Sequence, residues 1–176
     1  MMGITGHKLE PRPEDVIVVW FSCGAASAAA AYETVRRYGD ICDVRLVNNP
    51  VVEEDPDNLR FAQDVSEWLG RPIVFHRNPK FPAASAVEVW DVRRAMSFPY
   101  GAPCTDELKK RARQDYERQH HVDWHVLGFT ADERHRYERF VLTERSNVLP
   151  VLIDAGLTKA DCAALIQSAG IALPRV

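Results

Sequence analysis

The chain has 176 residues, of which 46% are hydrophobic and 27% charged, and its formal net charge is -3. These values are typical of a single globular domain with a core of its own. The negative net charge argues against indiscriminate binding to nucleic acid or to an anionic membrane. The charges are unevenly spread, however. Residues 109–145 contain nine of the 22 Lys and Arg, whereas residues 53–57 (EEDPD) are acidic, so a local anion site remains open.

The four cysteines are far apart and form no Cys-x-x-Cys pair; they are Cys23, Cys42, Cys104 and Cys162. This usage predicts neither a disulfide framework nor a zinc ribbon, and it fits a reducing, cytoplasmic location. The N-terminus has no signal pattern. Residues 16–32 carry no charge, but they change at Ser22 from β-branched and aromatic residues to alanine. We therefore expect a buried strand followed by a helix here, and no association with a membrane.

Hydrophobic patterning predicts alternating strands and helices after a loose lead-in at residues 1–15. Continuous β-branched runs predict buried strands, which we place at residues 16–21, 42–48, 72–77 and 123–130. Helical spacing, N-caps and terminal glycines predict helices, which we place at residues 25–38, 55–70, 85–96, 105–120 and 157–170. Residues 16–176 are therefore expected to form one domain.

This alternation indicates an α/β fold, with a twisted parallel sheet covered by helices on both faces in a Rossmann-like, three-layer arrangement. In such sheets ligands bind at the carboxyl ends of the strands. Those ends are predicted at residues 22–27, 48–54, 77–81 and 128–133.

The loop after the first strand reads SCGAAS, residues 22–27. Its small residues allow backbone N–H groups and hydroxyls to converge on a ligand, with the positive end of the following helix behind them. Small residues in such a turn also serve helix–strand packing, so this loop alone supports a phosphate site and a packed turn about equally.

Further stretches occur in the order of a known pattern. The chain resembles the PP-loop superfamily of adenine nucleotide α-hydrolase-like proteins, and within it the branch of the phosphoadenosine phosphosulfate (PAPS) reductases. The resemblance is carried over residues 16–174 by SCGAAS, VNNPVVEEDPDN, GAPCTDELKK, VLGFTADER and LPVLIDAGLTKADC. The chain departs from the family at several positions. Cys23 stands where the family has glycine, Ala26 where it has aspartate, and Thr130 where it has arginine.

The resemblance implies an adenine nucleotide as cofactor or substrate, either ATP or PAPS/PAP, with Mg²⁺ as a companion ion. Family members cleave ATP between its α and β phosphates to adenylate a substrate, or reduce a sulfonucleotide. The resemblance therefore favours an enzyme of one of these kinds. A PAPS reductase supplies its thiolate from a C-terminal segment, and we expect this chain to lack that cysteine-bearing tail.

The resemblance also implies which residues form the site. The cofactor-binding candidates are Ser22, Cys23, Gly24, Ser27, Asn48, Asn49, Lys109, Gly128, Glu133 and Arg136. The catalytic candidates are Cys104, as a thiol at the start of a helix, and Asp132. Each has a structural alternative: Cys23 and Cys104 as buried fillers, Asn48 and Asn49 as turn residues, and the residues near Arg136 as a helix with internal ion pairs. Lys80 and Arg139 are further candidates for phosphate contacts.

The stretch HHVDWH, residues 120–125, contains three histidines and Asp123. A metal centre needs a closed set of ligands with outer-shell support, so we predict a solvated helix end that leads into a strand, and no metal ligands. Three functions remain open: an enzyme of sulfonucleotide or adenylyl chemistry, a catalytically altered nucleotide-binding or partner-docking module, and a component of a nucleic-acid sulfur-modification system. The expected partners are a small nucleotide, a nucleic-acid or protein acceptor, and a second copy in a homodimer.

Overall fold

The computed structural model describes residues 10–99 and 101–175. Its centre is a sheet of four parallel strands in the order β3-β2-β1-β4. The strands are β1 (Val16–Trp20), β2 (Asp43–Asn48), β3 (Ile73–Phe75) and β4 (Trp124–Val126). The predicted α/β class and the parallel sheet with helices on both faces are confirmed.

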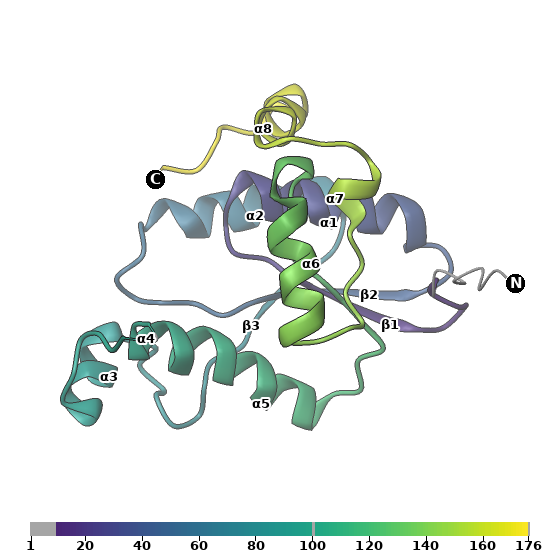
Figure 1. Cartoon of the computed structure of the whole chain (residues 1–176). Coiled ribbons are helices and arrows are strands. Elements are labelled where there is room, and N and C mark those ends of the chain that lie inside the picture. The colour runs from purple at the N-terminus through teal and green to yellow at the C-terminus, as the bar shows by residue number, and fades with distance from the viewer. Residues whose placement is uncertain (1–9, 100, 176) are drawn as a thin grey trace, which may run out of the picture.

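Helices cover the two faces of the sheet (Figure 1). One face carries α1 (Ala25–Tyr38), α2 (Asp57–Leu69), α7 (Val151–Asp154) and α8 (Lys159–Ser168). The other carries α4 (Pro103–Thr105), the π-helix η1 (Asp106–Arg111) and α5 (Ala112–Gln119), and α3 (Ala86–Arg93) packs against α4 beyond the edge of the sheet. The 3₁₀ turn η2 (Ala131–Glu133) and α6 (Arg134–Thr143) follow β4.

The alternation of side chains along β1 builds the core on both faces. Ile17 and Val19 pack with the alanines of α1 and with Leu152 of α7. Val18 and Trp20 point to the other side, where they pack with Tyr116 of α5. A strand buried on both faces needs such a continuous apolar run, because successive side chains alternate between the faces.

The predicted elements differ from the observed ones at the ends of the sheet. The strand expected at residues 72–77 is only three residues long, and the one expected at 123–130 ends at Val126. Beyond β4 the chain returns, and Val148 forms a parallel bridge with His125. The outer edge of β4 is therefore partly covered.

The predicted lead-in lies partly outside the described residues, which begin at residue 10. Its described part is fastened to the sheet. The Glu14 amide donates to the carbonyl of Ile41 (2.8 Å), and the Trp124 indole donates to the Asp15 carboxylate (2.8 Å).

Within the described residues, no helix has the length and apolar character needed to cross a membrane.

A buried histidine of β4, His125, lies beside Trp20 of the neighbouring strand β1. The Trp20 indole donates to Nδ1 of His125 (3.0 Å), and the two rings stack with centroids 6.0 Å apart. Burial, followed by the nearby Arg145 and Arg113 guanidiniums, lowers the pKa of His125 to about 3. His125 is therefore neutral at physiological pH and acts as a hydrogen-bond acceptor of the core.

Because of His125, we expect the folded protein to lose stability in mild acid. Between the unfolded pKa of about 6.5 and the folded pKa of about 3, only the unfolded chain takes up the proton. The free energy of unfolding should therefore fall as the pH drops, by about 1.4 kcal/mol per pH unit from this residue. Urea denaturation of the wild type and of His125→Asn, whose amide oxygen can still accept from Trp20, measures the difference. Identical slopes between pH 6.5 and pH 4.5 would contradict the prediction.

Candidate functional site

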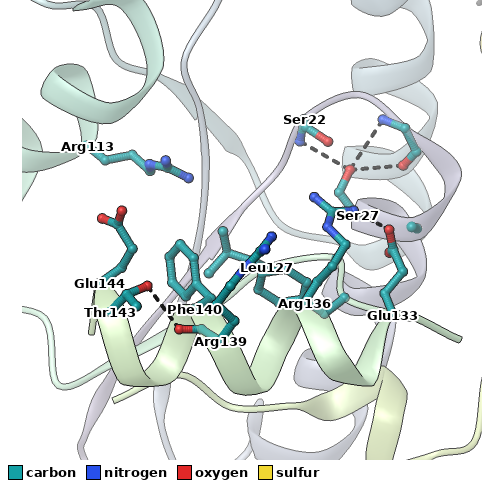
Figure 2. A pocket seen from close by; sticks show the side chains of 14 residues that line it. Ser22, Ser27, Arg113, Leu127, Glu133, Arg136, Arg139, Phe140, Thr143 and Glu144 are labelled. Carbon is teal, nitrogen blue, oxygen red and sulfur yellow. Dashed lines mark hydrogen bonds and ion pairs between the residues drawn. The ribbon is translucent and has the colours of Figure 1, made fainter. Parts of the chain in front are cut away.

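Three neighbouring cavities lie along the carboxyl ends of the strands. The largest, which we call the α6 pocket, has a volume of about 460 Å³. Its walls come from the β1–α1 loop, the end of β4, α5 and α6 (Figure 2). The residues that line it are Ser22, Gly24, Ala26, Ser27, Arg113, Leu127, Gly128, Phe129, Glu133, Arg136, Arg139, Phe140, Thr143 and Glu144.

The other two cavities continue from this pocket toward β2. The connecting pocket, about 130 Å³, shares Ser22, Arg113, Leu127 and Gly128 with it and adds Trp20, Phe21, Val47, Asn49 and Lys109. The β2 pocket, about 300 Å³, lies at the ends of β2 and β3. Its lining is Cys23, Asn48, Pro50, Val51, Val52, Glu54, Asp55, Pro56, Asn58, Leu59, Phe75 and Arg77.

A single hydroxyl shapes the β1–α1 loop. Oγ of Ser27 accepts hydrogen bonds from the amides of Ser22 (3.1 Å) and Gly24 (3.3 Å) and donates to the Gly24 carbonyl (2.9 Å). The Ser27 side chain is buried and thus fully engaged in the loop. Its contribution to a ligand site is to hold the loop in shape, whereas the exposed Ser22 side chain remains directed at the pocket.

The N-terminus of α1 opens onto the α6 pocket. The first N–H groups of a helix have no partner within the helix, and its dipole favours a negative charge there. Gly128 lies close to this helix end. A Cβ added at Gly128 would come within 3.0 Å of the Ser27 nitrogen and 3.1 Å of the Ala26 carbonyl carbon. The absence of a side chain at Gly128 therefore permits the close approach of β4 and leaves the helix end accessible.

Cys23 has the left-handed backbone conformation, with φ of 61°. A residue with a side chain gives up roughly 1 kcal/mol or more in this region, which glycine occupies freely. The thiol is buried and accepts a long hydrogen bond from the Asn48 amide (3.5 Å). Burial raises the pKa of Cys23 to about 11, so the thiol is protonated and unreactive at neutral pH.

Arginines from two elements face each other across the α6 pocket (Figure 2). Arg136 and Arg139 extend from α6, and Arg113 extends from α5. Arg136 is paired with Glu133. Within residues 10–99 and 101–175, the guanidiniums of Arg113 and Arg139 have no hydrogen bond and no ion pair.

Arg113 is the less solvated of these two. Burial, followed by the Arg145 guanidinium, lowers the pKa of Arg113, and the carboxylates of Glu117 and Glu144 only partly offset this. A desolvated cation without a counter-ion is unfavourable in a folded protein. This position therefore favours an anionic ligand.

Two asparagines at the end of β2, Asn48 and Asn49, hold together the strand ends that border the cavities. The Asn48 amide donates to the Phe21 carbonyl (2.8 Å), and the Asn49 amide donates to the His76 carbonyl (2.9 Å). Both side chains are buried. They hold the ends of β1, β2 and β3 together, and Asn48 also lines the β2 pocket while Asn49 lines the connecting pocket.

Lys109 lies between the cavities. It lines the connecting pocket, and its ammonium pairs with Glu54, which lines the β2 pocket. Lys109 belongs to the π-helix η1, a rare conformation that occurs frequently at functional sites. One turn further along, Arg113 lines the same connecting pocket.

The two predicted catalytic residues lie outside the three cavities. Cys104 packs beside Phe81, Val89 and Leu108. Asp132 is exposed; hydrogen bonds, first from Thr130, and then the nearby Lys159 lower its pKa. It therefore faces the start of α8, whereas Glu133 lines the α6 pocket while also bonding Thr130 and Arg136. The phosphate candidate Lys80 lies over the Phe81 ring.

No group of three or more His, Cys, Asp or Glu within the described part of the chain is arranged to hold a metal ion. In the stretch HHVDWH, His121 pairs with Asp123 (2.8 Å), and Asp123 accepts from the Val16 amide (2.8 Å). Asp123 thus fastens the start of β1. His125 is buried in the core, as described above.

Sequence reasoning missed much of the α6 pocket. The missed lining residues are Arg113, Leu127, Phe129, Phe140, Thr143 and Glu144. One signal was present for Arg113: it follows Lys109 by four residues in a predicted helix, and such a spacing places both on one face. Of the α6 wall, Arg136 and Arg139 were predicted, whereas Phe140, Thr143 and the adjoining Glu144 had no comparable signal.

Comparison of the chain with protein-family models and with curated proteins found no match.

Because Gly128 lies close to the backbone of Ala26 and Ser27, we expect that adding one methyl group at this position destabilises the protein. Gly128→Ala should lower the free energy of unfolding by about 1–3 kcal/mol, because the backbone at Ala26 and Ser27 has to move away. Gly24→Ala is the matched control in the same loop. Its added Cβ would meet only Ser22 Oγ, at 3.8 Å, so the loss there should stay below about 1 kcal/mol. Chemical denaturation of both variants measures this, and equal losses would contradict the predicted contact.

Proposed function

We propose that this protein binds an adenine nucleotide, with the phosphoryl groups in the α6 pocket and the base in the β2 pocket. The observation that carries the proposal is Arg113. Its guanidinium is desolvated, forms no hydrogen bond or ion pair among the described residues, and points into a cavity that also receives Arg139 and the N-terminus of α1. Phosphoryl oxygens match these donors, since guanidiniums bind them in a bidentate way and helix ends supply free amides.

The β2 pocket has the character that a flat heterocycle needs. Its walls include the exposed side chains of Val52, Leu59 and Phe75. Asn58 and Asp55 supply polar groups at its edge. Mostly apolar cavities with a few polar groups are typical of sites for small organic ligands. The connecting pocket, with Ser22 and Lys109, lies where a ribose would join the two ends of the nucleotide.

The resemblance to the PP-loop superfamily supports the choice of an adenine nucleotide. The left-handed backbone of Cys23 has the conformation that the glycine of the family motif would adopt without strain. The loop also lies at the carboxyl end of β1 in a parallel sheet, the position at which such folds bind ligands. Within the superfamily, the PAPS reductase-like branch remains our first choice, with sulfonucleotide reduction or ATP cleavage as the reaction.

The carboxylates that line the α6 pocket are only partly suited to bind Mg²⁺. Glu133 and Glu144 line the α6 pocket, but Glu133 is paired with Arg136 and Glu144 with Lys110. Mg²⁺ commonly binds through one or two carboxylates together with substrate phosphates. We therefore expect the ion to arrive with a nucleotide, and the arginines to provide the resident positive charge.

A second candidate is a binding module without catalysis, and three observations favour it. Cys104 packs into an apolar cluster away from the cavities, and the buried Cys23 thiol is protonated. Ala26 also lines the pocket where the family has aspartate. Titration of the protein with PAPS and a dithiol, or with ATP and a pyrophosphate assay, separates the candidates. Turnover of either nucleotide would contradict the module.

Nucleotide binding should depend on Arg113. We expect Arg113→Gln to weaken the binding of ATP, PAPS or PAP, measured by calorimetry, about 10- to 100-fold, the effect of losing a charge-assisted hydrogen bond. The same variant should leave the melting temperature unchanged or raise it, because it removes a desolvated charge.

Arg118→Gln is the matched control, since Arg118 lies on the same helix and its side chain is exposed. It should bind nucleotides as the wild type does. Two outcomes would contradict the proposal. One is the absence of a measurable affinity for every adenine nucleotide, with and without Mg²⁺. The other is an equal loss of affinity in the two variants.

A further inference from the structure

The helix α6 is the wall of the α6 pocket that is least integrated into the protein. None of its ten residues is buried, whereas α1 on the opposite side of the pocket has seven buried residues. The outward-facing Leu142 is 85% exposed. Helical stability in proteins comes mainly from the packing of an apolar face, so α6 has little to hold it in one position.

Among the described residues, the contacts of α6 lie mainly along one side and at its ends. The Phe129 ring contacts the rings of Tyr137 (centroids 6.0 Å apart) and Phe140 (5.5 Å apart). The Tyr137 hydroxyl donates to the Val148 carbonyl (3.1 Å). Just beyond the C-terminal end, Glu144 pairs with Lys110 and Arg145 with Glu117. These contacts tether the helix while leaving its arginine-bearing side free toward the pocket.

The charges across the pocket oppose its closure when no anion lies between them. Arg139 of α6 and Arg113 of α5 both point into the same space (Figure 2). Neither guanidinium forms a hydrogen bond or an ion pair within the part of the chain that the structure describes. The carboxylate of Glu144, which also lines the pocket, is paired with Lys110 and offsets the charge of Arg113 only in part. Like charges repel in a partly desolvated cavity, and an anion between them would replace that repulsion with two attractions.

We propose that α6 is a movable wall, and that Arg113 and Arg139 together recognise a multiply charged phosphoryl group by closing on it from opposite sides. Arg113 is the fixed half of this receptor, because α5 is anchored in the core by Tyr116. Arg139 is the moving half. The inference rests on the proposed function in taking a phosphoryl group as the ligand, and it adds which residues select for its charge.

Hydrogen exchange of the whole chain tests this proposal, with sodium pyrophosphate as the probe and sodium chloride of equal ionic strength as the reference. Pyrophosphate should slow exchange of the α6 amides about three- to tenfold. Inorganic phosphate, which carries less charge, should slow it less. Arg139→Gln should abolish the effect, and Arg139→Lys should restore part of it. Arg134→Gln, on the same helix but outside the pocket lining, should behave as the wild type.

Calorimetry in the same buffers keeps this inference distinct from the proposed function. If ATP binds while exchange in α6 stays unchanged, the moving wall is refuted and nucleotide binding stands. If pyrophosphate slows exchange in α6 but no adenine nucleotide binds, the adenine assignment fails and the moving wall stands. Equal protection in Arg139→Gln and the wild type would also refute the inference, and so would the absence of binding by any of these anions.

Discussion

The site depends on the hydrogen bonds that the Ser27 hydroxyl forms. It engages two amides and one carbonyl of the β1–α1 loop, and thereby determines where the N-terminus of α1 emerges from the sheet. Gly128 packs against that same helix end. The loop, the helix end and the end of β4 therefore form one rigid corner. A ligand that binds there meets donors whose positions are already determined, so little ordering is required on binding.

Three of the basic residues around this corner are paired with carboxylates, and two are not. Arg136, Lys109 and Lys110 each have a carboxylate within the protein, namely Glu133, Glu54 and Glu144. These pairs are partly exposed, and pairs of that kind contribute little to stability. Arg113 and Arg139 lack such partners among the described residues. The paired residues frame the cavities, whereas the unpaired arginines give the α6 pocket its positive charge in a chain that is negative as a whole.

Much of the fold could be predicted from the sequence, because local rules determine it. The β-branched run of β1, the alanine-rich helix after it and the strand–helix alternation require a parallel sheet with buried strands. Residue patterns alone therefore indicate the carboxyl ends of β1, β2 and β4 as the ligand edge. Ser22, Gly24, Ser27, Gly128, Glu133 and Arg136 do meet at the α6 pocket. Asn48 and Asn49 were open between a ligand contact and a structural role; they line neighbouring cavities and hold the strand ends.

The remainder depends on tertiary contacts that no local pattern encodes. Arg113 looks like any surface residue of a charged helix, and only the position of α5 relative to β4 brings it into the pocket. The direction of a side chain near a turn is equally hard to predict. Asp132 and Glu133 are neighbours, yet only Glu133 lines the α6 pocket, where it pairs with Arg136 and with Lys159 (3.4 Å), whereas Asp132 is exposed. Cys104 was chosen for its place at a helix start, but the packing of Phe81 and Leu108 around it decides its surroundings.

Cys23 shows how the loop can keep a left-handed backbone with a residue other than glycine. The left-handed backbone costs roughly 1 kcal/mol for a residue with a side chain. Burial of a small apolar side chain contributes a stabilisation of similar size. The sulfur is buried against Asn48 and forms part of the β2 pocket wall, so the two effects offset each other at this position. A cysteine held in this way preserves the conformation of the loop and, because its thiol stays protonated, adds no nucleophile beside the proposed base. Because the sulfur belongs to the wall of the β2 pocket, Cys23 would act on the proposed base through shape rather than through chemistry.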